Sequence, residues 1–182
     1  MTNQVLENMH TRRSCRAYKP DMVPQEALEQ IIEAGLYAPS SLGEQSAKII
    51  AVTDKATRDK LSKLNASFMP GKEGTDPFYG APVVLVVLSE KKRQAQFCDG
   101  CLVMENMMLA AHSLGYATCW IHRALEMFES DEGKAFLQAL GVEGDYVGVG
   151  NCIVGLPAWE ALPEPPARKD GRDGKGCDQS SG

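Results

Sequence analysis

Three arginines and a serine lie within five consecutive residues near the start of the chain, in the segment Arg12-Arg13-Ser14-Cys15-Arg16. Arginine carries planar, bidentate donors that match phosphate oxygens, and a serine hydroxyl adds one more donor. The segment therefore predicts a compact anion-binding site. The alternative is a charged stretch that only faces solvent.

A second polar segment follows a predicted helix. Pro39, Ser40 and Ser41 end that helix, and Gln45 comes four residues later, shortly before an expected strand. Such a loop presents backbone amides, two hydroxyls and a side-chain amide, which suit the polar edges of a flat heterocycle. An ordinary loop rich in proline and serine has the same composition, so the sequence leaves both interpretations open.

The elements around these segments follow from hydrophobic spacing. Helices are expected over 2–10, from Pro24 to about residue 37, and over 53–64, 94–114 and 129–140, and strands over 49–52, 82–88, 116–121 and 146–154. The order alternates helix and strand. The helix over 94–114 is apolar on nearly every side, which is typical of a central core helix. The glycines of 148–150 are interpreted as a turn that leads into the last strand.

The composition favours one compact domain. The chain has 182 residues, of which 43% are hydrophobic and 24% charged, with a formal charge of -5. We expect residues 1–160 to form that domain and residues 161–182, rich in proline, glycine and charge, to form an arm with a flexible end. The acidic balance argues against nucleic-acid binding, and the lack of a long apolar stretch or secretory signal predicts a cytoplasmic protein without a membrane span.

The cysteines offer one alternative chemistry. Six are scattered along the chain, which suggests free thiols. Cys98 and Cys101 have the CxxC spacing of a zinc site or a redox pair, but the chain has no second CxxC or HxxxH to complete a zinc site. We therefore predict no metal and interpret the pair as core cysteines.

Further passages complete a recognisable order of motifs. Asp99-Gly100 opens the long helix that continues through His112 to Gly115, Thr118-Cys119-Trp120-Ile121 follows, and Arg168-Lys169 forms a basic pair near the end. Together with the two polar segments, these passages resemble the nitroreductase family over roughly residues 6–169.

The resemblance implies an α+β fold, an α/β/α sandwich around a mixed, largely antiparallel sheet, with FMN at the interface of a homodimer. Arg12, Arg13, Ser14 and Arg16 would contact the phosphate, the ribityl chain and the pyrimidine side of the ring, with Arg16 near its N1 and C2 carbonyl edge. The remaining FMN-binding residues that the resemblance implies are Pro39, Ser40, Ser41 and Gln45 from the partner subunit, Trp120 and Ile121 beside the ring, and Arg168 and Lys169 over the phosphate.

The sequence departs from the family pattern at two places. Gly43 stands where an asparagine is usual, and Ser46-Ala47 follow the glutamine where proline and tryptophan are usual. These changes predict a roomier or more polar site that retains FMN less tightly. His122 stands where a glycine is common, so its side chain is a candidate to face the substrate.

The family's chemistry is carried by the flavin. Hydride passes from NADH or NADPH to the flavin N5 and then to a small acceptor such as a nitro compound or quinone. No side chain is required as acid or nucleophile, so we assign no catalytic residue, and a proton would come from water or His122. The alternatives are an FMN-binding sensor or carrier without turnover, and a flavin enzyme specialised for another reaction such as dehalogenation or oxidative ring formation.

Overall fold

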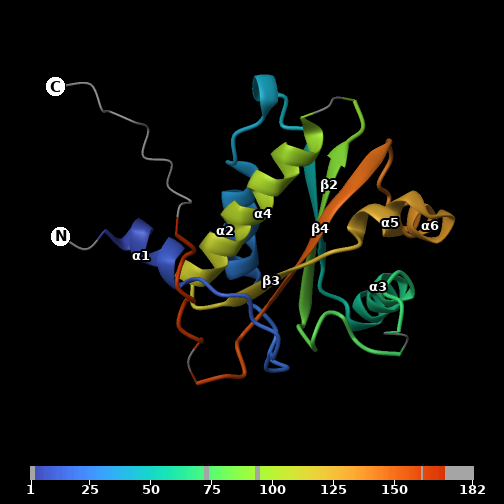
Figure 1. The fold of residues 1–182 in the computed structure, drawn as a ribbon. Helices are drawn as coiled ribbons and strands as arrows, with labels where there is room; N and C mark the ends of the chain where they lie inside the picture. Colours follow the sequence, from blue (N-terminus) through green and yellow to red (C-terminus); the bar gives the residue numbers. More distant parts are fainter. Residues whose placement is uncertain (1–2, 72–73, 93–94, 161, 171–182) are drawn as a thin grey trace.

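The computed structural model describes residues 3–71, 74–92, 95–160 and 162–170. Helices and strands alternate along most of this length (Figure 1). In chain order the elements are α1 (Gln4–Thr11), α2 (Gln25–Leu36), the 3-10 helix η1 (Ser41–Gly43), β1 (Ala47–Val52), α3 (Lys55–Ser67), β2 (Val83–Glu90), α4 (Gln96–Ser113), β3 (Ala117–Ile121), α5 (Ala124–Glu129), α6 (Asp131–Ala139) and β4 (Tyr146–Gly155).

The strands form one sheet in the order β1-β2-β4-β3, and every neighbouring pair is antiparallel. An isolated parallel bridge joins Ser14 to Thr118 on β3. The largely antiparallel sheet implied by the resemblance is therefore confirmed. The two central strands, β2 and β4, are buried along nearly their whole length, which explains why their sequences are apolar without a simple alternation.

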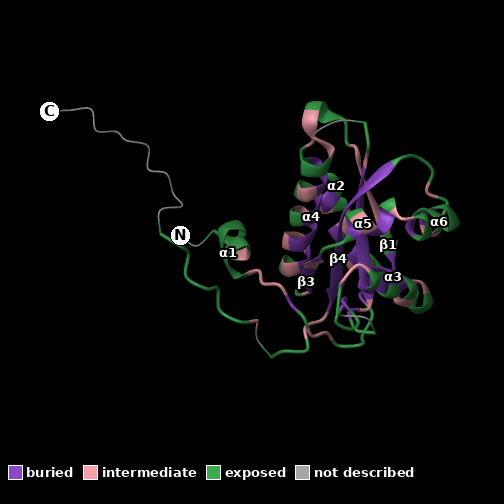
Figure 2. Ribbon diagram, turned by 45° about the vertical axis from the view of Figure 1, so that its right-hand side comes forward, coloured by how far each residue is buried: buried purple, intermediate pink, exposed green. Residues whose placement is uncertain are grey.

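Helices cover both faces of the sheet and make the expected sandwich. Helices α2 and α4 lie on one face, and α3, α5 and α6 lie on the other (Figures 1 and 2). Along β2, Val83, Leu85 and Val87 belong to the core under α2 and α4. Val84, Val86 and Leu88 belong to the opposite core, because successive strand residues point to opposite faces.

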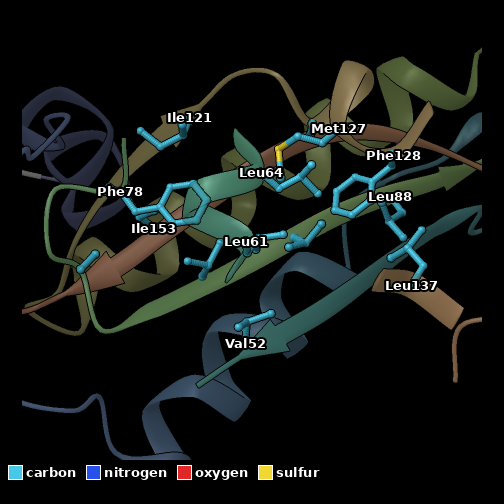
Figure 3. Close-up of a cluster of buried hydrophobic side chains, with 14 of the residues drawn as sticks. Val52, Leu61, Leu64, Phe78, Leu88, Ile121, Met127, Phe128, Leu137 and Ile153 are labelled. Carbon is cyan, nitrogen blue, oxygen red and sulfur yellow. The ribbon is translucent and has the colours of Figure 1, made fainter. Parts of the chain in front are cut away.

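The core on the α3 side is built from large side chains of several elements (Figure 3). Leu61 of α3, Phe78 of the loop between α3 and β2, and Phe128 of α5 are almost completely buried against the sheet. Burial of one such side chain stabilises a protein by about 1.5–3 kcal/mol. This cluster fixes α3 and α5 against β4 and so positions the turn that follows β3.

Two details differ from the expectations. Helix α4 is not buried on all sides, because Phe97 in its first turn is 42% exposed and Leu102 on its outer face is 45% exposed. Residues 148–150 lie inside β4 and not in a turn, opposite an irregularity in β2. Glycine is needed there because a Cβ on Gly148 would lie 2.0 Å from the carbonyl oxygen of Ala124. In the part of the chain described above, no helix is long and apolar enough to cross a membrane.

Candidate functional site

The basic segment lies against the outer edge of β3. Helix α1 ends at Thr11, and the chain then becomes extended at Arg12. Ser14 bridges Thr118, and the N–H of Cys15 donates to the carbonyl oxygen of Thr118 at 2.9 Å. Pairing with β3 therefore fixes the backbone between the arginines and holds their side chains near the end of α4.

Two guanidinium groups in this segment have buried N–H donors without an acceptor. The Nε atom of Arg12 lies 3.9 Å from a carboxylate oxygen of Glu105, but its Nη1 is buried and has no hydrogen-bond partner among the described residues. Arg13 donates from Nη1 and Nη2 to the carbonyl oxygens of Arg12 and His10, and its buried Nε has no partner there either. Buried donors are nearly always satisfied in folded proteins. A phosphate beside Ser14 would supply the missing acceptors, so these residues fit the phosphate of FMN.

His112 closes the inner side of this basic segment. Its Nε2 lies 2.8 Å from the hydroxyl oxygen of Thr11. Burial lowers the pKa of His112 below its ordinary value of 6.5, and the positive charges of Arg12 and Arg13 lower it further. The ring is therefore mainly neutral at pH 7, and the two guanidinium groups supply the positive charge. Arg16, two residues after Ser14, is exposed.

The loop of residues 40–46 has an unusual backbone. Leu42, Gly43 and Gln45 adopt φ angles of 54°, 69° and 50°. The N–H of Gln45 donates to the hydroxyl oxygen of Ser40 at 2.9 Å, and the N–H of Ser41 donates to Asp99 at 3.0 Å. Pro39, Ser40, Gly43 and Gln45 line an open hollow of about 510 Å³.

The end of β3 and the residue after it carry the third group of predicted residues. Trp120 packs over Gly150 in the core under α4, and its buried Nε1 has no partner within the described residues. Ile121 points to the opposite core, so only its backbone can face the same side as Trp120. The ring of His122 is exposed, with its centroid 6.1 Å from that of Trp120.

Comparison with known proteins decides the family. A sequence model of the Nitroreductase family matches residues 9–156. The chain belongs to the nitroreductase family. A crystal structure of a nitroreductase with bound FMN from Bacteroides fragilis is 32% identical, with a TM-score of 0.85, over 94% of this chain and 97% of that one. A second nitroreductase with bound FMN, from Desulfitobacterium hafniense, is 27% identical with a TM-score of 0.80, over 92% and 96%.

Curated relatives agree with this assignment. A putative NADH dehydrogenase/NAD(P)H nitroreductase of Archaeoglobus fulgidus is 30% identical over 165 residues, 86% of this chain and 87% of that protein. A relative with the same description from Methanothermobacter thermautotrophicus is 30% identical over 122 residues, and the match covers 59% of its length. An FMN reductase [NAD(P)H] of Bacillus subtilis is 44% identical over 62 residues, 34% of this chain and 25% of that protein.

Within this nitroreductase chain, the two polar groups lie toward opposite ends of α4. Thr11 contacts His112 near the C-terminal end, whereas Ser41 bonds to Asp99 in the first turn. With a rise of 1.5 Å per residue, Asp99 and His112 are about 20 Å apart along the helix axis. In Figure 1, η1 lies at the top of the molecule and α1 lies apart from it at the left. One chain therefore does not bring the loop and the basic segment together.

The basic pair of the arm also lies apart. Arg168 donates from Nε and Nη2 to the carbonyl oxygen of Pro166 at 3.2 and 2.9 Å, and Lys169 is exposed. Figure 2 shows this part of the arm outside the layers of helix and sheet. Among the described residues, no acidic side chain forms an ion pair with Arg168 or Lys169.

The two cysteines of the CxxC spacing lie on α4. Cys98 is exposed and Cys101 half-buried, which differs from the expected core positions, and the described residues contain no group of three ligands that could hold a metal.

Asn65, fully buried, donates to the carbonyl oxygen of His122 at 2.8 Å and so holds the turn after β3. Sequence reasoning gave no role to Asn65 or Asp99, because each acts on residues more than fifty positions away.

Proposed function

We propose that this chain is an FMN-dependent oxidoreductase that takes hydride from NADH or NADPH and reduces a small nitro, quinone or similar acceptor. The observation that carries the proposal is the pair of buried, unpartnered guanidinium donors of Arg12 and Arg13 beside Ser14. They lie in a fold shared with nitroreductases whose crystal structures have bound FMN. A relative described as an FMN reductase [NAD(P)H] supports the choice of donor.

Each group of residues has a task in this proposal. Arg12, Arg13 and Ser14 hold the phosphate, and Arg16 places a positive charge near the pyrimidine edge of the ring, where reduction increases negative charge. Trp120 and the backbone of Ile121 border the ring. Bound FMN supplies the redox chemistry by accepting hydride and passing electrons on. A proton for the acceptor would come from water or from His122, whose side chain is exposed.

We further propose that the working form is a homodimer. The loop with Pro39, Ser40, Ser41 and Gln45 lies too far along α4 to share a flavin with the basic segment of its own chain, so it would reach the flavin of the partner. The exposed apolar side chains support this arrangement. Seven of them lie on or beside α1, η1 and α4: Val5, Leu6 and Met9 on α1, Tyr37 at the end of α2, Leu42 in η1, and Phe97 and Leu102 on α4.

The arm has a role in the same assembly. Arg168 and Lys169 are exposed outside the layers of their own chain, as an arm that covers the partner's phosphate requires. The end of the arm, residues 171–182, lies outside the described residues. A cytoplasmic location stays a prediction from the sequence.

The test is the visible absorption spectrum of the purified protein after incubation with excess FMN and desalting, followed by anaerobic addition of NADH or NADPH. We expect a retained flavin spectrum that bleaches with at least one nucleotide. The double change Arg12→Ala/Arg13→Ala should abolish retention, whereas Lys60→Ala, which removes an exposed cation from α3, should not. Retained flavin that neither nucleotide bleaches favours an FMN-binding sensor or carrier, and absence of flavin contradicts the proposal.

A further inference from the structure

We propose that Asp99 is a positioning residue that fixes the loop of residues 40–46 and thereby sets the affinity for FMN. This inference rests on the proposed function for its link to the flavin. Its structural part, that one carboxylate anchors both ends of the loop, depends only on contacts within this chain.

Asp99 reaches the loop at its beginning and at its end. The residue lies in the first turn of α4 and is 7% exposed. One carboxylate oxygen accepts the N–H of Ser41 at 3.0 Å, and the other accepts the hydroxyl of Ser46 at 3.4 Å. A single side chain on α4 therefore holds the two ends of the loop together.

The anchor continues into the sheet. The hydroxyl oxygens of Ser46 and Ser89 are 3.0 Å apart, and Ser89 is completely buried on β2. A carboxylate only accepts hydrogen bonds, so the consistent arrangement has Ser89 donating to Ser46 and Ser46 donating to Asp99. The chain of contacts ties the end of the loop to β2 as well as to α4.

The backbone between these two points needs such support. Leu42 and Gln45 have positive φ angles of 54° and 50°, which cost free energy for residues other than glycine. The side chain of Leu42 is 81% exposed, so burial of an apolar group does not offset this cost within the chain. Release of either end would let the loop relax and move Gln45, which the proposed function places against the partner's flavin.

The direction of the hydrogen bonds predicts which substitutions are tolerated. Asp99→Ala removes both acceptors. Asp99→Asn keeps an oxygen for the N–H of Ser41, and its amide donates to Ser46, whose hydroxyl then turns toward Ser89. The asparagine variant therefore preserves the anchor without the charge. Ser46→Ala removes the hydrogen bond to Asp99 at the end of the loop and leaves the one from Ser41 at its beginning.

The experiment measures the dissociation constant for FMN by fluorescence titration of the flavin-free protein. We expect Asp99→Ala to weaken binding by about tenfold or more, the equivalent of one to two lost hydrogen bonds. Asp99→Asn should stay within about threefold of the wild type, and Ser46→Ala should fall between the two. The double change Asp99→Ala/Ser46→Ala should weaken binding by less than the product of the two single effects, because both single changes remove the contact between Asp99 and Ser46.

Asp54 provides a matched control. Its carboxylate also accepts a backbone N–H and a hydroxyl, both from Thr57 at 2.8 Å, but it caps α3 on the other face of the sheet. Asp54→Ala should lower the melting temperature and leave FMN affinity unchanged. A merely structural role for Asp99 would give the same pattern as Asp54, and that result would overturn the proposal.

Hydrogen exchange separates the two parts of the inference. In the flavin-free protein, Asp99→Ala should speed exchange of the amides of residues 41–46 relative to both Asp54→Ala and the wild type. If Asp99→Ala leaves the exchange rates of these amides unchanged, Asp99 does not anchor the loop. A wild type that binds no FMN overturns the proposed function and the link to affinity, while exchange still decides whether Asp99 holds the loop. Should Asp99→Ala fail to fold, Asp99→Asn and Ser46→Ala give the same comparison.

Discussion

The thiol of Cys152 illustrates how one buried residue makes stability depend on pH. Cys152 lies on β4 and is fully buried. Burial raises the pKa of Cys152 from 9.0 to about 12, and the neighbouring Cys119 contributes in the same direction. Burial likewise raises the pKa of Tyr18 far above its ordinary value of 10.0. Both side chains are therefore kept neutral in the folded protein.

Stability should consequently fall in alkali. The stability that Cys152 contributes is fully present below the pKa of about 9 that its thiol has in the unfolded chain. It is lost as the pH rises toward the higher pKa of the folded protein. We expect the free energy of unfolding to fall by up to about 1.4 kcal/mol per pH unit for each such group. Urea unfolding between pH 8 and about pH 10.5 measures this slope. Cys152→Ala should reduce it, whereas Cys98→Ala on the exposed face of α4 should not. If Cys152→Ala and the wild type lost stability equally steeply with pH, the buried thiol of Cys152 would not be a source of the pH dependence.

At the scale of elements, Asp76 connects α3 to the loop that precedes β2. Its carboxylate accepts hydrogen bonds from Arg58 and Ser62 of α3, both at 2.6 Å, and from the N–H groups of Phe78 and Gly80 at 3.0 and 2.7 Å. Burial alone would raise the pKa of Asp76, but these four donors hold it below its usual range. Phe78 is in turn central to the core of Figure 3.

Asp76→Asn should lower the free energy of unfolding at pH 7 by about 1–2 kcal/mol, toward the low end for a charged acceptor because the side chain is partly exposed. The lowered pKa gives stability that is present above about pH 4 and is lost as the pH falls below it. Urea unfolding from pH 6 to about pH 3 should therefore show a smaller acid loss in the variant than in the wild type. An identical acid profile would show that the four donors do not act through the charge of Asp76.

At the scale of the whole molecule, the proposed dimer explains why α4 carries apolar residues on nearly every side. One face of the helix packs on the sheet, Leu102 is exposed on the outer face, and Phe97 is exposed in the first turn. Leu102→Glu would place a charge in the proposed interface. We expect sedimentation velocity to show a dimer for the wild type and monomers for this variant, with loss of bound FMN. Leu140→Glu, a similarly exposed position after α6, is the control and should stay dimeric. A monomeric wild type that retains FMN would exclude shared sites.

The sequence by itself determined much of this protein. The spaced motifs resembled those of the nitroreductase family, and that resemblance implied the α+β sandwich; the family and the fold are both confirmed. The basic segment was identified because three arginines in five residues are a local pattern. The FMN contacts of the individual residues stay predictions. Such patterns can be recognised in the sequence because hydrophobic spacing and clustered charge involve residues that are close together along the chain.

The tertiary structure decided how distant segments combine. The contact between Ser41 and Asp99 joins residues 58 positions apart, and no local period encodes it. Only packing showed that the loop and the basic segment occupy opposite ends of α4, that one face of α4 is exposed, and that Gly148 lies within β4 opposite the backbone of α5. Such features depend on which helix covers which strand. The side-chain pattern along the chain predicts which face of an element is buried. Only the three-dimensional packing determines which other element covers that face.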